Sequence, residues 1–411
     1  MPLYGGQSLL NVPGSICAAL GVSTAGLGPP LEAGVLPPAM LGGVRSVVLL
    51  VVDGLGRWQL DGAIARGQAP TLAGLATEAA AGSPRVSLAT ITSVFPSSTV
   101  PALTTLNTGL PPAEHGLIGW TMFLEEFGER AESARWGPAA GSGSYLDERL
   151  GGHDPRAFLG VETLHSRLAG AGVRPTVVGP AGLRRSGFSR MVFDGAEYRG
   201  TFANSSLFVA VEEILARPRR DRRRFVYVYW DALDLVAHLH GPRTPEHREE
   251  LAALDFLLGR WLARQQRRRD VLFLLTADHG HVDSPEADAV RLDQDDALLG
   301  LLRAPPSGER RLVYLHARPG QAAVLRVYCA ERLGELVELV EPEAAFAAGW
   351  FGPGPVAPAA RRRAGDLMLL ARPGVQLVYP ASERPAGRIF GGNHGGMAPD
   401  EMLVPLLALR L

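Results

Sequence analysis

The sequence predicts an α/β protein with a mostly parallel central sheet, helices flanking that sheet, and a small inserted α+β subdomain. Three observations support this fold class. Short aliphatic runs recur along the first two-thirds of the 411-residue chain, helical patterns lie between them, and the pattern changes after residue 283. Continuous aliphatic runs are typical of parallel strands that are buried on both faces. Strands that alternate with helices are typical of βαβ units, in which helices cover the sheet.

The elements of the predicted core follow one another in this alternating order. The first strong strand is expected at residues 46–52, where the run SVVLLVV ends in Asp53-Gly54. Residues 1–42 contain Glu32 as their one charged residue, and we expect them to pack on the surface of the core. Later aliphatic runs predict strands at residues 174–178, 225–229 and 271–275, and helical patterns predict helices at residues 161–169, 207–216 and 245–264.

The change of pattern after residue 283 predicts an inserted subdomain at residues 284–386. This segment contains a strand-like run at 311–316, a helical pattern at 321–333 and a stretch rich in Pro and Gly at 351–358. Strand-like runs at 366–371 and 375–379 then return toward the core. We therefore expect a catalytic core built from residues 1–283 and 387–411.

Charge and cysteine content exclude several classes of protein. The chain has 41 basic and 42 acidic residues and a formal net charge of -1, which argues against nucleic-acid binding through a general basic field. Two cysteines cannot form a disulfide framework. No apolar run approaches the ~20 residues needed to cross a bilayer, and the first basic residue is Arg45, unlike a secretory signal. We expect a cytoplasmic protein that binds neither membranes nor nucleic acid polymers, and the sequence leaves its oligomeric state open.

Polar residues that follow aliphatic strands are the first candidates for a functional site. Ligands in open α/β sheets bind beyond the carboxyl ends of the strands. Asp53 directly follows the strand at 46–52, and Asp278-His279 follows the strand at 271–275. Asp-Gly after a strand is also a common turn. The Asp-His pair at a core edge is harder to explain structurally, because a buried carboxylate and imidazole need a compensating partner.

Two further candidates lie on a short helical turn and in a late loop. Asp234 and His238 are four residues apart, which places both on one face of a helix, and Gly241-Pro242 ends that turn. His394 lies between glycines, where the backbone can fold closely around a ligand. The ordinary alternatives are a surface Asp/His pair and a glycine-rich turn.

Together these candidates form a set of carboxylates and imidazoles that suits divalent cations. Zn²⁺ takes such ligands, and Mn²⁺ does so in a more oxygen-rich site. Six ligands exceed one tetrahedral site, so we expect two metal ions, with Zn²⁺ preferred and Mn²⁺ as the alternative. The expected metal ligands are Asp53, Asp234, His238, Asp278, His279 and His394.

Residues 95–109, FPSSTVPALTTLNTG, indicate the beginning of a helix. A hydroxyl cluster followed by Pro and helix-compatible residues is typical of a helix N-terminus, where free N–H groups and the helix dipole favour an anion. A phosphate could bind there. The structural alternative is an ordinary Ser/Thr cap.

The order and spacing of five blocks resemble the alkaline phosphatase superfamily, specifically its type I phosphodiesterase and nucleotide pyrophosphatase branch. The blocks span residues 51 to 396, nearly the whole chain. They are VVDGLG at 51–56, FPSSTVPALTTLNTGLPPAEHG at 95–116, DLVAHLHGP at 234–242, TADHG at 276–280 and GNHGG at 392–396.

The resemblance implies a role for each matched residue. It makes Thr99 the nucleophile, which would also contact a metal ion. Asp53, Asp278 and His279 would bind the metal that touches Thr99, and Asp234, His238 and His394 would bind the other. Three residues that lie beside these ligands could support them, His240, His281 and Asp283.

The resemblance also implies the reaction, a metal-dependent hydrolysis of a small phosphoester through a phosphothreonine. A nucleotide is one candidate substrate. A phosphomonoesterase, phosphonate hydrolase or phosphomutase of the same superfamily is the alternative, and a non-catalytic metal-binding protein is the alternative from another class. We expect diesters to be preferred, because residues 86–129 contain no arginine to bind a dianionic monoester and Ala102 could supply a small apolar wall. Arg388 is the expected source of any arginine that reaches the site.

Overall fold

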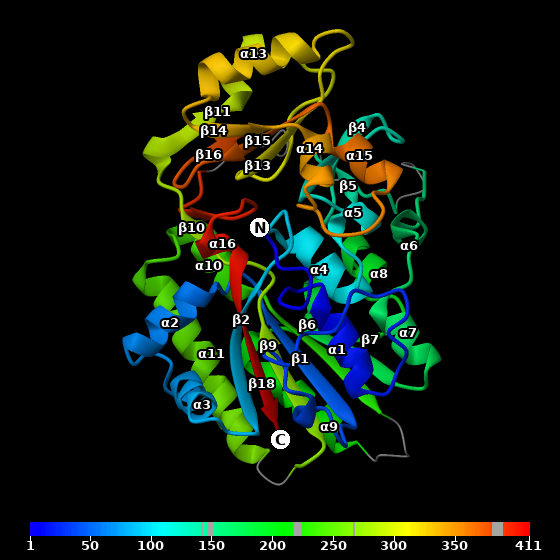
Figure 1. Ribbon diagram of the computed structural model, residues 1–411, viewed down its shortest axis with the longest axis vertical. Coiled ribbons are helices and arrows are strands. Elements are labelled where there is room, and N and C mark those ends of the chain that lie inside the picture. Colours follow the sequence, from blue (N-terminus) through cyan, green and yellow to red (C-terminus); the bar gives the residue numbers. More distant parts are fainter. Residues whose placement is uncertain (141–142, 147–150, 218–222, 266–267, 380–388) are drawn as a thin grey trace.

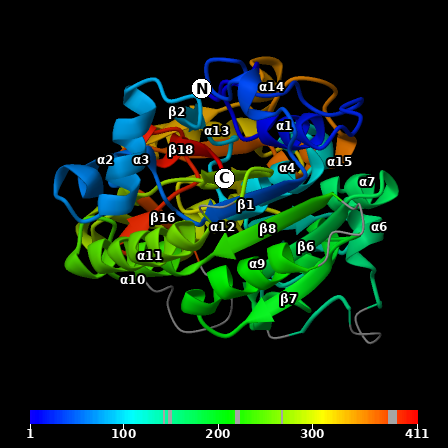
Figure 2. The same cartoon turned by 90° about the horizontal axis from the view of Figure 1, so that it is seen from below.

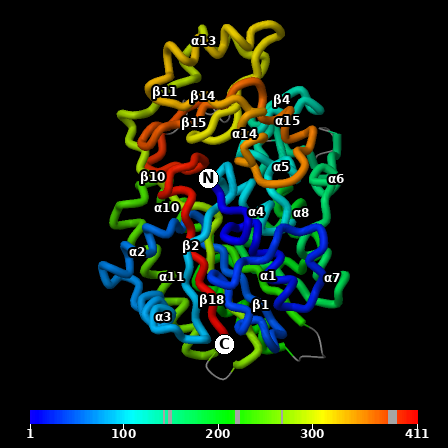
Figure 3. The backbone as a smooth tube through the Cα atoms, in the orientation of Figure 1, coloured from blue at the N-terminus to red at the C-terminus, as the bar shows by residue number. Residues whose placement is uncertain are grey.

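The computed structural model describes all residues except 141–142, 147–150, 218–222, 266–267 and 380–388, and every structural statement below concerns the described residues. Two seven-stranded sheets dominate the fold, one above the other in Figure 1. The first sheet has one end near the second sheet and one end far from it, and the C-terminus lies at the far end (Figure 3). Among the described residues no helix is both long enough and apolar enough to span a membrane. The cytoplasmic location stays a prediction.

The central sheet is mostly parallel, as predicted. Five of its strands form a parallel series, and β18 runs antiparallel between two of its neighbours. The strands are, in spatial order, β2 (Val86–Thr92), β18 (Leu403–Arg410), β9 (Val271–Thr276), β1 (Ser46–Val52), β8 (Arg224–Trp230), β6 (Arg174–Pro180) and β7 (Glu197–Thr201). Every residue of β1 and β9 is buried, as expected for aliphatic strands covered on both faces.

Helices flank both faces of this sheet (Figure 2). Helices α1 and α4 lie on one face, and α9 and α11 lie on the other. The helices of this layer are α1 (Asn11–Ala19), α2 (Arg57–Ala65), α3 (Pro70–Ala80), α4 (Thr99–Thr108), α5 (Pro112–His115), α6 (Pro155–Leu159), α7 (Leu164–Gly170), α8 (Gly187–Val192), α9 (Leu207–Ala216), α10 (Ala232–His240), α11 (Pro245–Arg264) and α16 (Pro399–Met402). The first 42 residues pack on the core as expected, since α1 contacts α4 and Leu9 N donates to Thr92 O.

The second sheet is antiparallel and draws its strands from two distant parts of the sequence. Its order is β14 (Val337–Val340), β15 (Leu367–Ala371), β13 (Leu312–Leu315), β12 (Ser307–Gly308), β3 (Thr121–Leu124), β4 (Glu129–Glu132) and β5 (Gly137–Pro138). Strands β3 to β5 therefore complete a sheet that begins within residues 284–386. The division of the chain into a core and an insertion at 284–386 stays a prediction.

Smaller elements surround the second sheet and join it to the first. Helices α12 (Asp296–Leu301), α13 (Ala322–Leu333), α14 (Pro342–Ala347) and α15 (Pro358–Ala364) pack around it. Two short strand pairs complete the described structure, β10 (Val282–Asp283) with β17 (Gly392–Asn393), and β11 (Ala289–Arg291) with β16 (Gln376–Val378).

The three central parallel strands end at the same level. Val51 of β1 lies opposite Tyr229 of β8 and opposite Thr276 of β9. The polar residues that follow these strands therefore meet at one edge of the sheet, the edge that faces the second sheet in Figure 1.

Candidate active site

One cluster of buried side chains forms where β1 and β9 end. His279 Nε2 lies 3.4 Å from Asp53 Oδ1 and 3.5 Å from Asp278 Oδ2. Thr99, the first residue of α4, places its Oγ1 3.1 Å from the same nitrogen. The structure thus brings the predicted nucleophile to the three residues expected to bind its metal.

Backbone and tyrosine donors fix the orientation of both carboxylates. The Tyr229 hydroxyl donates to Asp53 Oδ2. The backbone N–H groups of Gly54 and His279 donate to Asp278 Oδ1 at 3.1 and 3.0 Å. The other oxygens, Asp53 Oδ1 and Asp278 Oδ2, are buried and have no hydrogen-bond partner among the described residues.

The charge balance of this first cluster calls for a cation. Burial raises the pKa of Asp53 well above its usual value, and the charges of Asp278 and Asp234 raise it further, against the hydrogen bond from Tyr229. Ligand atoms of Asp53, Asp278 and His279 all lie within 4.8 Å of one another. Two orphaned carboxylate oxygens and one imidazole nitrogen that face each other fit a divalent metal.

A second cluster forms beside the first, from α10 and the loop after β17. His238 Nε2 lies 3.4 Å from Asp234 Oδ1, in the predicted arrangement on one face of α10. His394 Nε2 lies 3.7 Å from the same oxygen and 3.2 Å from His238 Nε2. The two clusters adjoin each other, because the rings of His279 and His394 stack with centroids 3.6 Å apart.

Backbone carbonyls orient the two imidazoles of the second cluster. His238 Nδ1 lies 2.9 Å from Gly392 O, and His394 Nδ1 lies 3.1 Å from Ser97 O. Donation from each Nδ1 leaves Nε2 unprotonated and directed at Asp234. Burial, together with the neighbouring His279 and His238, holds the pKa of His394 well below its usual value, so its ring is neutral and able to bind a metal.

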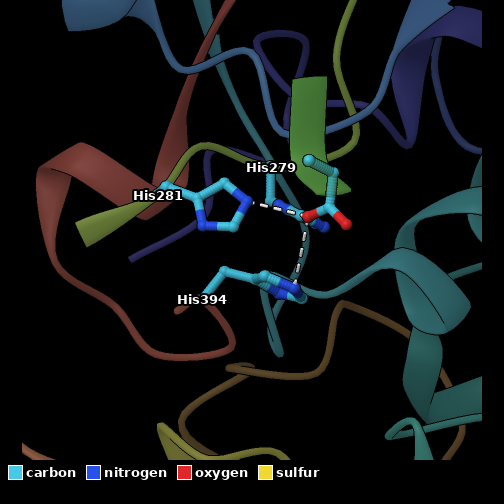
Figure 4. A group of neighbouring side chains, drawn as sticks. His279, His281 and His394 are labelled. Carbon is cyan, nitrogen blue, oxygen red and sulfur yellow. Dashed lines mark hydrogen bonds and ion pairs between the residues drawn. The ribbon is translucent and has the colours of Figure 1, made fainter. Parts of the chain in front are cut away.

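His281 also belongs to this cluster. Its Nε2 lies 2.7 Å from Asp234 Oδ1, and Figure 4 shows it converging with His279 and His394. Ligand atoms of these three histidines and Asp234 all lie within 4.8 Å of one another. Burial lowers the pKa of His281 to about 3, so the neutral ring donates Nε2–H to the carboxylate and restrains it. The sequence suggested such a supporting role, which stays a prediction.

Comparison with known proteins shows which family this chain belongs to. The sequence model of the type I phosphodiesterase / nucleotide pyrophosphatase family matches residues 47–397. The chain belongs to this family. It is therefore a member of the alkaline phosphatase superfamily and an enzyme that hydrolyses phosphoric ester or phosphoanhydride bonds. The roles of the seven predicted site residues stay predictions, although the structure brings all seven together.

Solved structures share the fold of this phosphodiesterase family member. Murine ectonucleotide pyrophosphatase / phosphodiesterase 5 has a TM-score of 0.63 and 16% identity, with 88% of this chain and 87% of that chain covered. An inactive threonine-to-alanine variant of that murine enzyme in complex with AMP matches equally well. Phosphonoacetate hydrolase from Sinorhizobium meliloti 1021, in complex with phosphonoacetate, has a TM-score of 0.62 and 20% identity, with 90% and 91% covered.

The second cluster and Thr99 line a cavity of about 280 Å³. Its walls include Thr99, Asp234, His238 and His394 from the central layer. The remaining walls come from the second sheet and the segments that join it. Of these residues only Asn393 lies in one of the five sequence motifs. The others are Trp120, Thr121, Gly308, Glu309, Arg310, Tyr379 and Phe390.

One prediction about the cavity needs correction, and another concerns a residue outside the described part of the chain. Ala102 is fully buried inside α4 and is absent from the described cavity wall, so it is not the expected apolar wall. The arginine that reaches the cavity is Arg310, whose guanidinium lies 4.1 Å from the centre of the Phe390 ring. Arg388 lies outside the described residues.

Proposed function

We propose that this enzyme hydrolyses small phosphodiesters or nucleotide pyrophosphates through a phosphothreonine formed on Thr99. One observation carries the proposal. The Thr99 hydroxyl lies in the cavity wall, at the beginning of α4 and 3.1 Å from His279, beside two clusters of metal-binding side chains. The threonine-to-alanine variant of the murine neighbour is described as inactive, which supports a threonine nucleophile.

The two clusters would each hold one divalent ion. Asp53, Asp278 and His279 would hold the ion next to Thr99, and Asp234, His238 and His394 would hold the other. We expect Zn²⁺ for this mixture of imidazole and carboxylate ligands, with Mn²⁺ as the alternative. When bound, such ions lower the pKa of a coordinated hydroxyl and offset the charge of a phosphoryl group.

The side chains and backbone supply the remaining chemistry. Thr99 Oγ1 gives up its proton to solvent water and bonds to phosphorus, while the bond from phosphorus to the leaving oxygen breaks and that oxygen takes up a proton from solvent water. The N-terminal N–H groups of α4 would stabilise the charge of the phosphoryl oxygens. In the second step a water oxygen bonds to phosphorus, the bond from phosphorus to Thr99 Oγ1 breaks, and Oγ1 takes up a proton of that water.

Phosphonate hydrolysis is the second candidate, and Arg310 favours it. A guanidinium in the cavity wall suits a substrate that carries a second anionic group, such as the carboxylate of a phosphonoacetate-like compound. The phosphonoacetate hydrolase neighbour shares the fold.

A substrate panel with and without chelator tests the proposal. The purified protein is assayed with bis-p-nitrophenyl phosphate, p-nitrophenyl phosphate and phosphonoacetate, first after chelation and then after zinc or manganese is restored. We expect metal-restored hydrolysis of the diester, absent in Thr99→Ala. Hydrolysis of phosphonoacetate in preference to the diester would establish the second candidate. A protein that binds metal but hydrolyses none of the three would support the non-catalytic alternative.

A further inference from the structure

We propose that Glu309 is a positioning residue that holds the Ser98 hydroxyl away from the N-terminus of α4. The backbone N–H groups of Thr99 and Val100 then stay available to the phosphoryl group of the substrate. This inference rests on the proposed function, and it assigns a task to a cavity residue that lies outside all five sequence motifs.

Ser98 occupies the cap position of α4 without capping it. Its backbone is extended, with φ -139° and ψ 153°, as in an ordinary N-cap, and Ser is among the preferred capping residues. Its side chain nevertheless makes no hydrogen bond to the helix. Ser98 Oγ instead donates to Glu309 Oε1.

A released Ser98 hydroxyl could accept a hydrogen bond from only one N–H group at the beginning of α4. A capping hydroxyl accepts from the second or third residue of a helix, and the third residue of α4 is Pro101, which has no N–H. Ala102 N already donates to Ser98 O at 3.0 Å. A released Ser98 hydroxyl would therefore turn to Val100 N–H, one of the two donors nearest the nucleophile.

Contacts with neighbouring segments fix the position of the Glu309 carboxylate, which in turn binds the Ser98 hydroxyl. Its carboxylate is buried, and Trp120 N donates to the same Oε1 at 2.6 Å. Gly395, next to His394, has φ +117°, and a Cβ atom there would lie 2.7 Å from Glu309 Cβ. Glu309 thus contacts three segments that border the cavity, those of Ser98, Trp120 and Gly395.

Substitutions of Glu309 can distinguish a positioning role from a role in proton transfer. Holding Ser98 requires an acceptor oxygen at Oε1 and no negative charge. Glutamine keeps that oxygen, whereas alanine removes it. A proton-transfer role would instead be lost in both variants.

The test compares Glu309→Ala, Glu309→Gln, Ser98→Ala and the double variant Ser98→Ala/Glu309→Ala in the zinc-loaded protein. Two quantities are measured, kcat/KM for bis-p-nitrophenyl phosphate and the affinity for inorganic phosphate by calorimetry. We expect Glu309→Ala to weaken both by about 10-fold or more. Loss of a whole oxyanion donor costs about 10²–10³-fold in kcat, and a released Ser98 hydroxyl covers Val100 N–H for only part of the time. Glu309→Gln should stay within about 3-fold of wild type, a change below 1 kcal/mol. The double variant should be more active than Glu309→Ala, because it has no hydroxyl to cover Val100 N–H.

Several outcomes would overturn the inference. Glu309→Gln as impaired as Glu309→Ala would show that the charge or proton matters, and a double variant no better than Glu309→Ala would show that Ser98 is not the intermediary. Glu309→Leu, which keeps the buried volume, is tested in parallel in case the alanine variant does not fold. If the wild-type protein binds phosphate but hydrolyses no ester, the proposed function is refuted. The role of Glu309 is still tested in that case, because the phosphate affinities of the variants can be compared.

Discussion

Replacing Thr99 with alanine is the sharpest test of the reaction, because the structure gives each hydroxyl of residues 97–99 a different partner. Ser97 Oγ donates to Gly396 O at 2.8 Å, and Ser98 Oγ donates to Glu309. Thr99 Oγ1 alone contacts a predicted metal ligand, His279. We therefore expect Thr99→Ala to abolish turnover, and Ser98→Ala, with its hydroxyl outside the reaction, to serve as the matched control.

The expected magnitudes differ strongly between stability and catalysis. Thr99→Ala removes one hydrogen bond, which costs about 1 kcal/mol, and alanine regains a few tenths through its higher helix propensity. For a chain of this length Tm should fall by no more than about 3 °C. Loss of the nucleophile should lower kcat by at least ~10³-fold, or about 4 kcal/mol in activation free energy.

The assay follows turnover and the covalent intermediate separately. Hydrolysis of bis-p-nitrophenyl phosphate gives kcat and KM, and acid quenching with a radiolabelled diester shows label on the protein when a phosphothreonine accumulates. Circular dichroism and zinc content confirm that each variant is folded and loaded. Full activity in Thr99→Ala together with an inactive Ser98→Ala would show that the assigned nucleophile is wrong by one residue.

Three further predictions test the metals, the substrate and the cavity. The protein should bind two divalent ions per chain and lose activity on chelation; His394→Ala should weaken mainly one ion and Asp278→Ala the other, and dialysed protein that takes up no divalent ion would contradict this. The ratio of kcat/KM for bis-p-nitrophenyl phosphate to that for p-nitrophenyl phosphate should exceed one under identical metal conditions. A clear monoester preference, which the Arg310 guanidinium in the cavity wall would favour, would exclude the diesterase assignment. Burial raises the Glu309 pKa from 4.5 to about 7, so its contribution to stability is present below pH 4.5 and is lost as the pH rises through 7. In chelated protein, wild type should lose about 3 kcal/mol relative to Glu309→Gln over that range, and equal slopes in denaturant titrations would contradict this.

Several strands and helices of the central layer could be predicted because their own residues form continuous aliphatic runs or helical patterns. Strand β1 and helices α9 and α11 have the bounds that their aliphatic and helical patterns predicted. Strand β18 was not predicted, since its run at 403–410 contains Pro405 and nothing local indicates that it pairs antiparallel between β2 and β9. Likewise, no local pattern shows that β3 to β5 join a sheet formed about 170 residues later in the chain, because pairing between distant strands depends on the whole fold.

The same distinction holds for the site. Asp53 and Asp278 could be predicted because they lie within two residues of the ends of buried strands, and parallel strands end at a common edge. Glu309 could not, because it lies in the turn between β12 and β13, where one acidic residue is ordinary. Its importance comes from long-range contacts with Ser98 and Trp120.

The two sheets contribute different groups to the cavity. The six predicted metal ligands and Thr99 lie on segments that adjoin the central sheet, and the common level at which β1, β8 and β9 end brings Asp53 and Asp278 together. Arg310, which also lines the cavity, lies between β12 and β13 of the second sheet, and Tyr379 follows β16 of a short strand pair. A substrate held between these layers would meet its reaction chemistry on one side and the groups that select its substituents on the other. The predicted metal ligands lie outside the second sheet, and the turn that carries Glu309 contacts Gly395, next to His394. Side-chain changes elsewhere in that sheet would alter the groups around a substrate and leave the predicted ligands in place.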